Sequence, residues 1–184
     1  MLCAALLACG NPSSAPAFKN TDITGADFAK NLSLTDHKGE RRTLANFKGK
    51  VVVVFFGFTH CPDVCPTTLG ELATALKALG PQAENVQVLF ITVDPERDTR
   101  EVLAQYVPAF DASFLGLRGT PEETAAVAKE FKIIYQKQGG GENYTVDHSA
   151  GTYIFDRDGR LRLYAPFGQK ADALVHDIRL LLQS

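Results

Sequence analysis

The sequence predicts an α/β domain in which a central mixed β-sheet is flanked by helices. A run of β-branched and aromatic residues, Val51 to Phe56, is typical of a strand buried on both faces of a sheet. A helix with one apolar face follows it, and then a second apolar strand, Val86 to Val93. Strands that alternate with helices in this way form layered α/β structures.

The composition fits one globular domain. The chain has 184 residues, of which 45% are hydrophobic and 22% are charged, and a chain of this size can bury a full core. The formal net charge is -2, and the basic residues are scattered along the chain. A nucleic-acid-binding surface needs a basic patch or stripe, so no nucleic-acid partner is expected.

The first nine residues resemble the end of a bacterial lipoprotein signal. The Leu-Leu-Ala-Cys sequence that ends at Cys9 fits the lipobox, in which the signal is cleaved before a cysteine that then carries lipid. The apolar stretch is too short for a membrane-spanning helix, which takes about 20 residues. No Lys or Arg precedes it, although such signals usually begin with a charged segment. We expect residues 1–9 to be a signal remnant and residues 10–30, which include NPSSAP, to form a linker.

The remaining residues, 31–184, are expected to form the domain, which begins with an N-terminal β-hairpin. Leu32 to Thr35 alternates between apolar and polar residues, and Asp36 to Gly39 is typical of a turn. The extended pattern resumes at Arg42 to Leu44. The long strand at residues 51–56 follows this hairpin.

The first helix is predicted to begin near Pro66 and to end at Leu79. Proline suits a first helical turn because its missing N–H has no partner there. Four leucines and an alanine (Leu69, Leu72, Ala73, Leu76 and Leu79) share one face at helical spacing, and Gly80 with Pro81 ends the helix.

Two more helices are predicted from their start signals. Asp98, with Glu101 three residues later, makes a capping box for a helix that runs towards Pro108. Thr120 opens the sequence TPEE, which is a stronger start signal, and this helix is expected to end near Phe131.

The C-terminal part of the domain completes the predicted order of elements. A strand is expected around Ile133–Gln136. Thr152–Phe155 and Leu161–Tyr164 flank Asp158-Gly159, which predicts a β-hairpin. An amphipathic helix follows at Ala171–Leu182. A parallel pair of strands followed by an antiparallel hairpin and a closing helix is the order of a thioredoxin-like fold.

Cys61 and Cys65, in the segment FTHCPDVCP, are the residues best suited to chemistry. They fall where the first long strand ends and the first helix begins, and open α/β sheets place their sites in that region. Residues i and i+4 of a helical turn share a face, so the two sulfurs could approach one another or one metal ion. The partial positive charge at a helix N-terminus stabilises thiolates.

The cysteine spacing by itself leaves several kinds of site open. The pair can close a disulfide, or it can hold a soft metal such as copper(I) or zinc through two thiolates. Two inert core cysteines are the third reading, and the proline that follows each cysteine makes it the least favoured. A third ligand is needed to choose the metal.

The histidines, at positions 37, 60, 148 and 176, are the candidates for that third ligand. His37 lies in a predicted turn and His176 on a predicted helix, and both are expected at the surface. His60 adjoins Cys61, but neighbouring residues in an extended segment point in opposite directions. His148 lies just before the C-terminal hairpin, in a loop that faces the cysteines in the proposed fold, and is the preferred candidate.

Two thiolates and one imidazole suit copper(I) in a trigonal site, or copper(II) with a weak fourth donor. Structural zinc usually has four protein ligands, and the sequence offers no clear fourth. Met1 is the sole methionine and lies in the leader, so the mature domain offers no thioether.

Three motifs in order, GFTHCPDVCP, ITVDPERDT and VDHSAGTYIFDRDGRL, resemble those of the Sco/SenC family of copper proteins that assist cytochrome c oxidase assembly. The resemblance covers most of the domain, from the early hairpin to the last helix. It implies a thioredoxin-like fold that binds copper through Cys61, Cys65 and His148. It also places Asp94 at an acidic position of the family, either beside the site or facing a partner.

The resemblance implies a copper chaperone that delivers copper to the dinuclear CuA centre of cytochrome c oxidase, or otherwise matures that centre. The implied partners are the oxidase subunit that carries CuA and other periplasmic copper chaperones. The implied location is extracytoplasmic, in the periplasm or at the outer face of the cytoplasmic membrane. Lipid on Cys9 would replace the transmembrane anchor of most family members.

The alternative function is a thiol–disulfide oxidoreductase, in which Cys61 and Cys65 form a redox-active pair that reduces the CuA-site cysteines. The two cysteines are separated by three residues, whereas the common redox motif has two. A ligand-type histidine is also not needed for simple exchange. Both functions can coexist, because copper binding requires the reduced pair.

Overall fold

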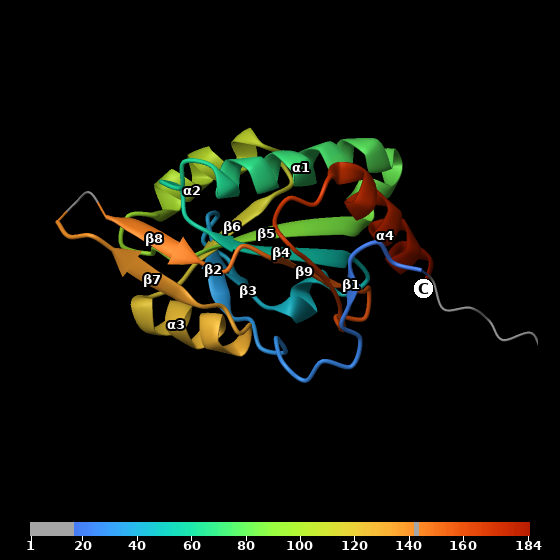
Figure 1. Ribbon diagram of the computed structural model, residues 1–184, viewed down its shortest axis with the longest axis horizontal. Coiled ribbons are helices and arrows are strands. Elements are labelled where there is room, and N and C mark those ends of the chain that lie inside the picture. The colour runs from blue at the N-terminus through green and yellow to red at the C-terminus, as the bar shows by residue number, and fades with distance from the viewer. Residues whose placement is uncertain (1–16, 142–143) are drawn as a thin grey trace, which may run out of the picture.

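The computed structural model describes residues 17–141 and 144–184 (Figure 1). Its strands are β1 (Thr21–Asp22), β2 (Leu34–Asp36), β3 (Arg41–Arg42), β4 (Val51–Gly57), β5 (Val86–Thr92), β6 (Leu115–Arg118), β7 (Tyr135–Gln138), β8 (Thr145–His148), β9 (Thr152–Phe155) and β10 (Leu161–Ala165). Its α-helices are α1 (Val64–Leu79), α2 (Arg100–Tyr106), α3 (Pro121–Glu130) and α4 (Ala171–Gln183).

Eight of the strands form one mixed sheet with the order β1-β10-β9-β4-β5-β6-β2-β3. β4 and β5 are parallel, from Val51 opposite Val86 to Gly57 opposite Thr92, and every residue of both strands is buried. The long apolar runs therefore form the buried central strands that the sequence predicts. β9 pairs antiparallel with the other edge of β4, which makes the sheet mixed.

Both faces of β4 carry aromatic side chains, and each face packs in a different half of the core. The Phe55 ring lies 6.2 Å from that of Phe90, while the Phe56 ring lies 5.2 Å from that of Phe131, just after α3. Successive side chains of a strand point to opposite faces, so the sheet at β4 separates the two halves of the core. In Figure 1, α1 lies above the sheet and α3 below it.

β6, a parallel neighbour of β5, was not predicted from the sequence. It has four residues, and Gly116 interrupts its apolar pattern. A Cβ at Gly116 would lie 2.9 Å from Val107 and 3.2 Å from Leu103, so the glycine lets α2 and the turn after it approach the strand. A glycine is needed at this position because the helix packs closely against the strand. The same glycine interrupts the apolar pattern by which a strand is recognised in the sequence.

The C-terminal hairpin forms where the sequence predicts it. β9 and β10 pair antiparallel, and Asp156 organises the turn between them. Its Oδ1 accepts hydrogen bonds from the backbone N–H groups of Asp158 at 3.1 Å and Arg160 at 2.9 Å. Gly159 has φ +80°, a conformation that L side chains rarely adopt.

The two predicted capping boxes have different outcomes. α3 begins at its capping box, in which Thr120 and Glu123 satisfy each other's backbone N–H groups. The box predicted at Asp98 is wrong, because Thr99 caps α2 and accepts from the backbone N–H of Val102 at 3.3 Å. The Asp98 carboxylate is buried instead and binds the loop that follows β4.

The strand predicted around residues 133–136 begins at Tyr135 and does not join the large sheet. It is β7, and it pairs antiparallel with β8, so that Tyr135 lies opposite His148. Residues 146–149 were expected to form a loop, but Thr145–His148 form β8, a short and mostly polar strand. In Figure 1 the β7–β8 hairpin projects beyond the end of the large sheet.

At the start of the domain, β2 and β3 pair antiparallel, and β2 also pairs with β6. The turn between β2 and β3 folds back onto β6. His37 in this turn is 8% exposed, and its Nδ1 accepts a hydrogen bond from the Gly116 N–H at 3.1 Å. The expected surface position of His37 is therefore wrong, because the turn packs against a strand that the sequence did not reveal.

Residues 17–30, which fall in the expected linker, lie against the domain. β1 pairs with β10 at the edge of the sheet, and Asn20 and Ala29 are buried. The leader, with Cys3 and Cys9, and the first part of the expected linker lie outside the described residues. Among the helices that the structure describes, none combines the length and the apolar character that crossing a membrane requires.

The Asp177 carboxylate of α4 fastens the N-terminal segment to the domain. It is fully buried and accepts hydrogen bonds from the backbone N–H groups of Lys19 and Asn20, each at 2.8 Å. The Asn20 amide and the His176 ring also bind it, at 2.8 Å and 2.7 Å. Burial alone raises the pKa of the Asp177 carboxyl, but these hydrogen bonds outweigh it and hold that pKa below its ordinary value.

We expect Asp177→Asn to lower the free energy of unfolding by about 1–3 kcal/mol at neutral pH, because the new amide would face N–H donors. A carboxyl with a lowered folded pKa stabilises the protein above its unfolded pKa, roughly 3.9, and this stability is lost as the pH falls through the folded value. In urea unfolding, the difference between parent and variant should therefore shrink as the pH is lowered below 4. Asp172→Asn, whose carboxylate is 76% exposed, is the control. A pH-independent difference would contradict the assignment.

Candidate metal centre

Cys61 and Cys65 lie where β4 gives way to α1. Cys61 is in the connecting loop, and Cys65 is in the first turn of the helix. The Cys65 backbone N–H donates a hydrogen bond to the Cys61 Sγ at 3.5 Å. An N–H group at the start of a helix has no partner within the helix, and the Cys61 sulfur supplies one. Both cysteines are free.

Cys65 is the buried member of the pair. Burial raises the pKa of its thiol, although a hydrogen bond with the Phe58 backbone opposes this rise. The absence of a side chain at Gly57 makes room for the sulfur: a Cβ there would lie 2.7 Å from the Cys65 Sγ and 2.8 Å from the Phe90 ring. Gly57 therefore lets the sulfur sit directly against the end of β4.

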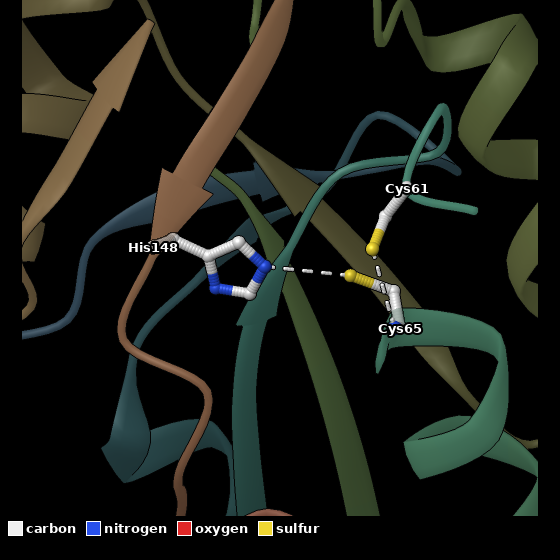
Figure 2. Close-up of side chains that lie close together, drawn as sticks. All are labelled: Cys61, Cys65 and His148. Atoms are coloured by element: carbon white, nitrogen blue, oxygen red, sulfur yellow. Dashed lines mark hydrogen bonds between the residues drawn. The ribbon is translucent and has the colours of Figure 1, made fainter. Parts of the chain in front are cut away.

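His148, the last residue of β8, brings an imidazole to the buried cysteine. Its Nε2 lies 3.6 Å from the Cys65 Sγ. Figure 2 shows the ring pointing toward that sulfur. Its Nδ1 lies 2.9 Å from the carbonyl oxygen of Ser149. Because a carbonyl can only accept a hydrogen bond, the proton is on Nδ1 and the lone pair of Nε2 faces the sulfur. Burial lowers the pKa of the imidazole, which favours the neutral form that binds metals.

Two buried aromatic rings support the imidazole edge-on. The ring centroid of Phe58 lies 5.9 Å from that of His148 at an interplanar angle of 86°, and that of Phe55 lies 6.3 Å away at 66°. Together with Cys65 they form an apolar wall on one side of the site. Water is excluded from this side, and electrostatic interactions are stronger there than in solvent.

The ligand atoms of Cys61, Cys65 and His148 all lie within 4.8 Å of one another (Figure 2). Among residues 17–141 and 144–184, no other group of three or more His, Cys, Asp or Glu side chains is arranged in this way. Cys65 is buried, whereas Cys61 and His148 are partly exposed, so an ion can reach the three donors from solvent. Two thiolates and a neutral imidazole fit a soft, three-coordinate metal.

The other histidines lie apart from this group. His60 is exposed, and its Nδ1 lies 3.2 Å from the Thr59 Oγ1, so proximity to Cys61 in sequence does not make it a ligand. His176 binds Asp177 on α4, and His37 binds the backbone of β6. His148, the histidine that the predicted fold placed opposite the cysteines, is therefore the one whose ring lies beside them.

Asp98, which was predicted to cap a helix, supports the cysteine loop instead. It is fully buried and accepts hydrogen bonds from the Thr59 N–H at 3.1 Å, the Thr59 hydroxyl at 2.6 Å and the Thr92 hydroxyl at 2.5 Å. Burial raises its pKa despite these bonds. Asp98 thus fixes the loop that leads from β4 to Cys61. The available signal was a second aspartate in ITVDPERDT.

The SCO1/SenC family model matches residues 20–183, which is most of the chain and includes the whole site. The chain belongs to the SCO1/SenC family. The mitochondrial SCO2 homolog of Mus musculus is 39% identical over 167 residues, which cover 89% of this chain and 64% of that protein. This SCO1/SenC chain therefore spans less than two thirds of the length of that relative.

Solved structures agree with the family assignment. Apo Sco1 of Thermus thermophilus is 42% identical, with a TM-score of 0.81 over 90% of this chain and 98% of its own. ScoI of Bradyrhizobium japonicum, solved with copper bound, is 39% identical, with a TM-score of 0.77 over 83% of this chain and 98% of its own. The predicted thioredoxin-like fold is thus confirmed.

We expect Gly57→Ala to displace the Cys65 sulfur, because the new methyl group has no room between that sulfur and Phe90. Overpacking of this kind lowers the free energy of unfolding by about 1–3 kcal/mol, which urea unfolding of the reduced protein would measure. Gly70→Ala on α1 is the matched control, since a Cβ there meets nothing within 4 Å. It should be neutral or stabilising by up to roughly 1 kcal/mol. Equal effects of the two substitutions would contradict the close approach at Gly57.

Proposed function

We propose that this SCO1/SenC protein is a copper chaperone for cytochrome c oxidase assembly and that it holds copper through Cys61, Cys65 and His148. The observation that carries the proposal is the grouping of two sulfurs and an unprotonated imidazole nitrogen within 4.8 Å. The Bradyrhizobium japonicum relative, 39% identical, has copper bound in its solved structure. The donor set also supports copper, because soft thiolates favour copper(I).

The three donors have different parts in holding the ion. Cys65 is buried beside Phe90 and supplies a donor that a partner protein cannot reach directly. Cys61 is partly exposed. The Nδ1–H of His148 donates to a backbone carbonyl, as the non-ligating N–H of metal-binding histidines usually does. Copper binding requires both sulfurs as thiolates, so each thiol releases its proton as its bond to copper forms.

Transfer by ligand exchange follows from this difference in exposure. A sulfur or nitrogen of the partner approaches the ion from the side of Cys61 and His148 and forms a bond to copper. The bond to Cys61 or His148 then breaks, and the bond to Cys65 breaks last. Copper keeps its oxidation state throughout. The proposed recipient is the CuA centre of the oxidase subunit, and the proposed donors are other periplasmic copper chaperones.

Thiol–disulfide exchange with the CuA-site cysteines is the second candidate function. The observation that favours it is the exposure of the two sulfurs. Cys61 is partly exposed and its Sγ accepts a hydrogen bond from the Cys65 N–H, while Cys65 is buried. The Cys61 thiolate would attack a target disulfide and release one target thiolate. Cys65 would then attack Cys61 and release the second. Two electrons pass to the target, and the chain is left with a Cys61–Cys65 disulfide.

We also propose that the domain is held outside the cytoplasm by lipid on Cys9. The support is the Leu-Leu-Ala-Cys sequence and the polar segment that follows it. A single acyl chain binds a membrane only weakly, and stable anchoring then usually requires a second membrane signal. A lipidated N-terminal cysteine would carry the chain at the membrane surface, where the oxidase subunit is also found.

We expect His148→Ala to weaken copper(I) binding by roughly 100-fold or more, because removal even of outer partners of metal ligands costs 10- to 100-fold. The measurement is anaerobic competition of the reduced whole chain against a copper(I) chelator. His60→Ala is the matched control, since it removes the exposed histidine next to Cys61 and should change affinity little. Unchanged copper binding by His148→Ala would show that His148 is not a ligand.

The same proteins separate the two candidate functions. A chaperone parent binds one copper tightly, and His148→Ala loses copper affinity while it largely keeps dithiol redox activity. A parent that binds no copper yet rapidly reduces a disulfide in an oxidised CuA-domain peptide would favour the oxidoreductase.

We expect mass spectrometry of the membrane fraction to find a mature chain that begins at Cys9 and carries lipid on that residue. Cys9→Ala should block both the cleavage and the lipid attachment, and it should release the chain from membranes. Cys3→Ala is the control, because Cys3 is not preceded by the Leu-Leu-Ala sequence. An unlipidated chain that keeps Met1 would contradict this proposal.

A further inference from the structure

The β7–β8 hairpin carries His148 but is not a part of the eight-stranded sheet, whose strand β4 leads into the cysteine loop and α1. Within the described residues, β7 and β8 form a sheet of their own, and no backbone ladder joins them to the eight-stranded sheet. His148 is therefore one end of an arm that extends from the domain (Figure 1). A hairpin of two strands is marginally stable alone, so other contacts must fix the position of this arm.

Val146 of β8 packs in the hydrophobic core, and polar contacts come from the segment that follows β5. The hydroxyl of Tyr144, the residue before β8, donates a hydrogen bond to the Asp94 Oδ1 at 2.6 Å. The Arg97 Nη1 donates to the Tyr144 carbonyl oxygen at 2.8 Å, and the Arg97 guanidinium lies 3.6 Å from the centroid of the Tyr144 ring. The Arg97 Nε binds the other oxygen of Asp94. Asp94, Arg97 and Tyr144 thus form a closed set of contacts, which we call the arm clamp.

Burial makes the arm clamp stronger than an ordinary surface contact. The Asp94 side chain is fully buried and that of Arg97 is 18% exposed. Electrostatic interactions in such a place are poorly screened, and a buried carboxylate oxygen left without a donor is strongly unfavourable. Lys137 on β7 also binds Glu96 at 2.6 Å, but these side chains are 43% and 59% exposed, so this pair adds little.

The arm clamp is linked to the imidazole through two routes. β8 begins at Thr145, next to Tyr144, and ends at His148, so Tyr144 and His148 are roughly 13 Å apart at the rise of a β-strand. The Arg97 guanidinium also lies 5.9 Å from the centroid of Phe58, the ring that supports His148 edge-on. A shift at Tyr144 would therefore move the far end of the strand on which the ligand nitrogen is carried.

We propose that Asp94, Arg97 and Tyr144 position His148 for copper by holding the β7–β8 hairpin against the segment after β5. Tyr144 is a positioning residue, because it acts through the strand and does not reach the metal donors itself. The inference rests on the proposed function. With the arm clamp closed, the imidazole is already in place when copper binds, and the cost of ordering the arm does not reduce the affinity.

The test uses Tyr144→Phe in the whole chain, which removes the hydroxyl that binds Asp94 and keeps the ring. Tyr135→Phe is the matched control, since it makes the same change on the neighbouring strand, at a hydroxyl with no hydrogen bond among the described residues. We expect Tyr144→Phe to weaken copper(I) binding about tenfold, the equivalent of one hydrogen bond to a charged group. Tyr135→Phe should stay within roughly twofold of the parent.

Two further readouts separate positioning from general destabilisation. In a double-mutant cycle, Tyr144→Phe should have no further effect on copper affinity once His148→Ala has removed the ligand. In the copper-free protein, hydrogen exchange at the amides of β8 should be faster in Tyr144→Phe, whereas exchange in β4 should match the parent. Arg97→Lys is a second variant; it keeps the charge but not the planar group that binds Asp94 and Tyr144 together.

The outcomes distinguish this inference from the proposed function. If His148→Ala leaves copper binding unchanged, the proposed function fails, while faster exchange in β8 would still support the arm clamp. If His148→Ala loses copper but Tyr144→Phe equals Tyr135→Phe in both affinity and exchange, the arm clamp is overturned. Equal acceleration of exchange in β4 and β8 would also overturn it, because the hydroxyl would then stabilise the whole domain.

Discussion

The approach of the His148 Nε2 to the Cys65 Sγ, at 3.6 Å, is the contact on which the rest of the site depends. It joins two residues that are 83 positions apart in the sequence and that belong to helix α1 and strand β8. Three conditions make it possible. The absence of a side chain at Gly57 leaves room for the sulfur, Phe58 supports the imidazole, and the Ser149 carbonyl takes the Nδ1 proton. Each condition is local, but together they direct a metal-binding lone pair at a buried thiol.

The site is asymmetric, and the asymmetry fits a protein that must both hold and release an ion. The side of Cys65 is apolar and closed, because β4, Phe90 and α1 surround the sulfur. The side of Cys61 is open to solvent. A tightly enclosed ion would exchange slowly, and a fully exposed one would be held weakly. Placement of one thiolate on each side allows a partner ligand to enter while a buried donor still holds the metal.

Buried acidic residues organise the loops around this centre. Asp98 binds the Thr59 backbone and the hydroxyls of two threonines, which fixes the approach to Cys61, and Asp94 binds Arg97 and Tyr144, which fixes the approach to His148. Both belong to the segment ITVDPERDT after β5, whose parallel pairing with β4 places it beside the cysteine loop. One short segment thus controls both halves of the site. The buried carboxylates of Asp94 and Asp98 accept hydrogen bonds from groups of the protein, as buried carboxylates must.

The sequence by itself determined the central strands, the start and end of α1, the C-terminal hairpin, α4 and the two cysteines at the strand–helix junction. These features depend on local patterns: apolar runs, proline and glycine at helix ends, and the Asp158-Gly159 turn. The spacing of Cys61 and Cys65 was compatible with copper, zinc and disulfide chemistry. The motifs and the placement of His148 then favoured copper. Only the tertiary structure decided that β6 lies beside β5, that β7 leaves the main sheet to pair with β8, that His37 is buried, and that Asp98 turns inward while Thr99 caps α2. The physical reason is the same in each case. A short polar strand, a buried turn or an acidic residue near a helix start has several local solutions, and long-range packing selects one of them.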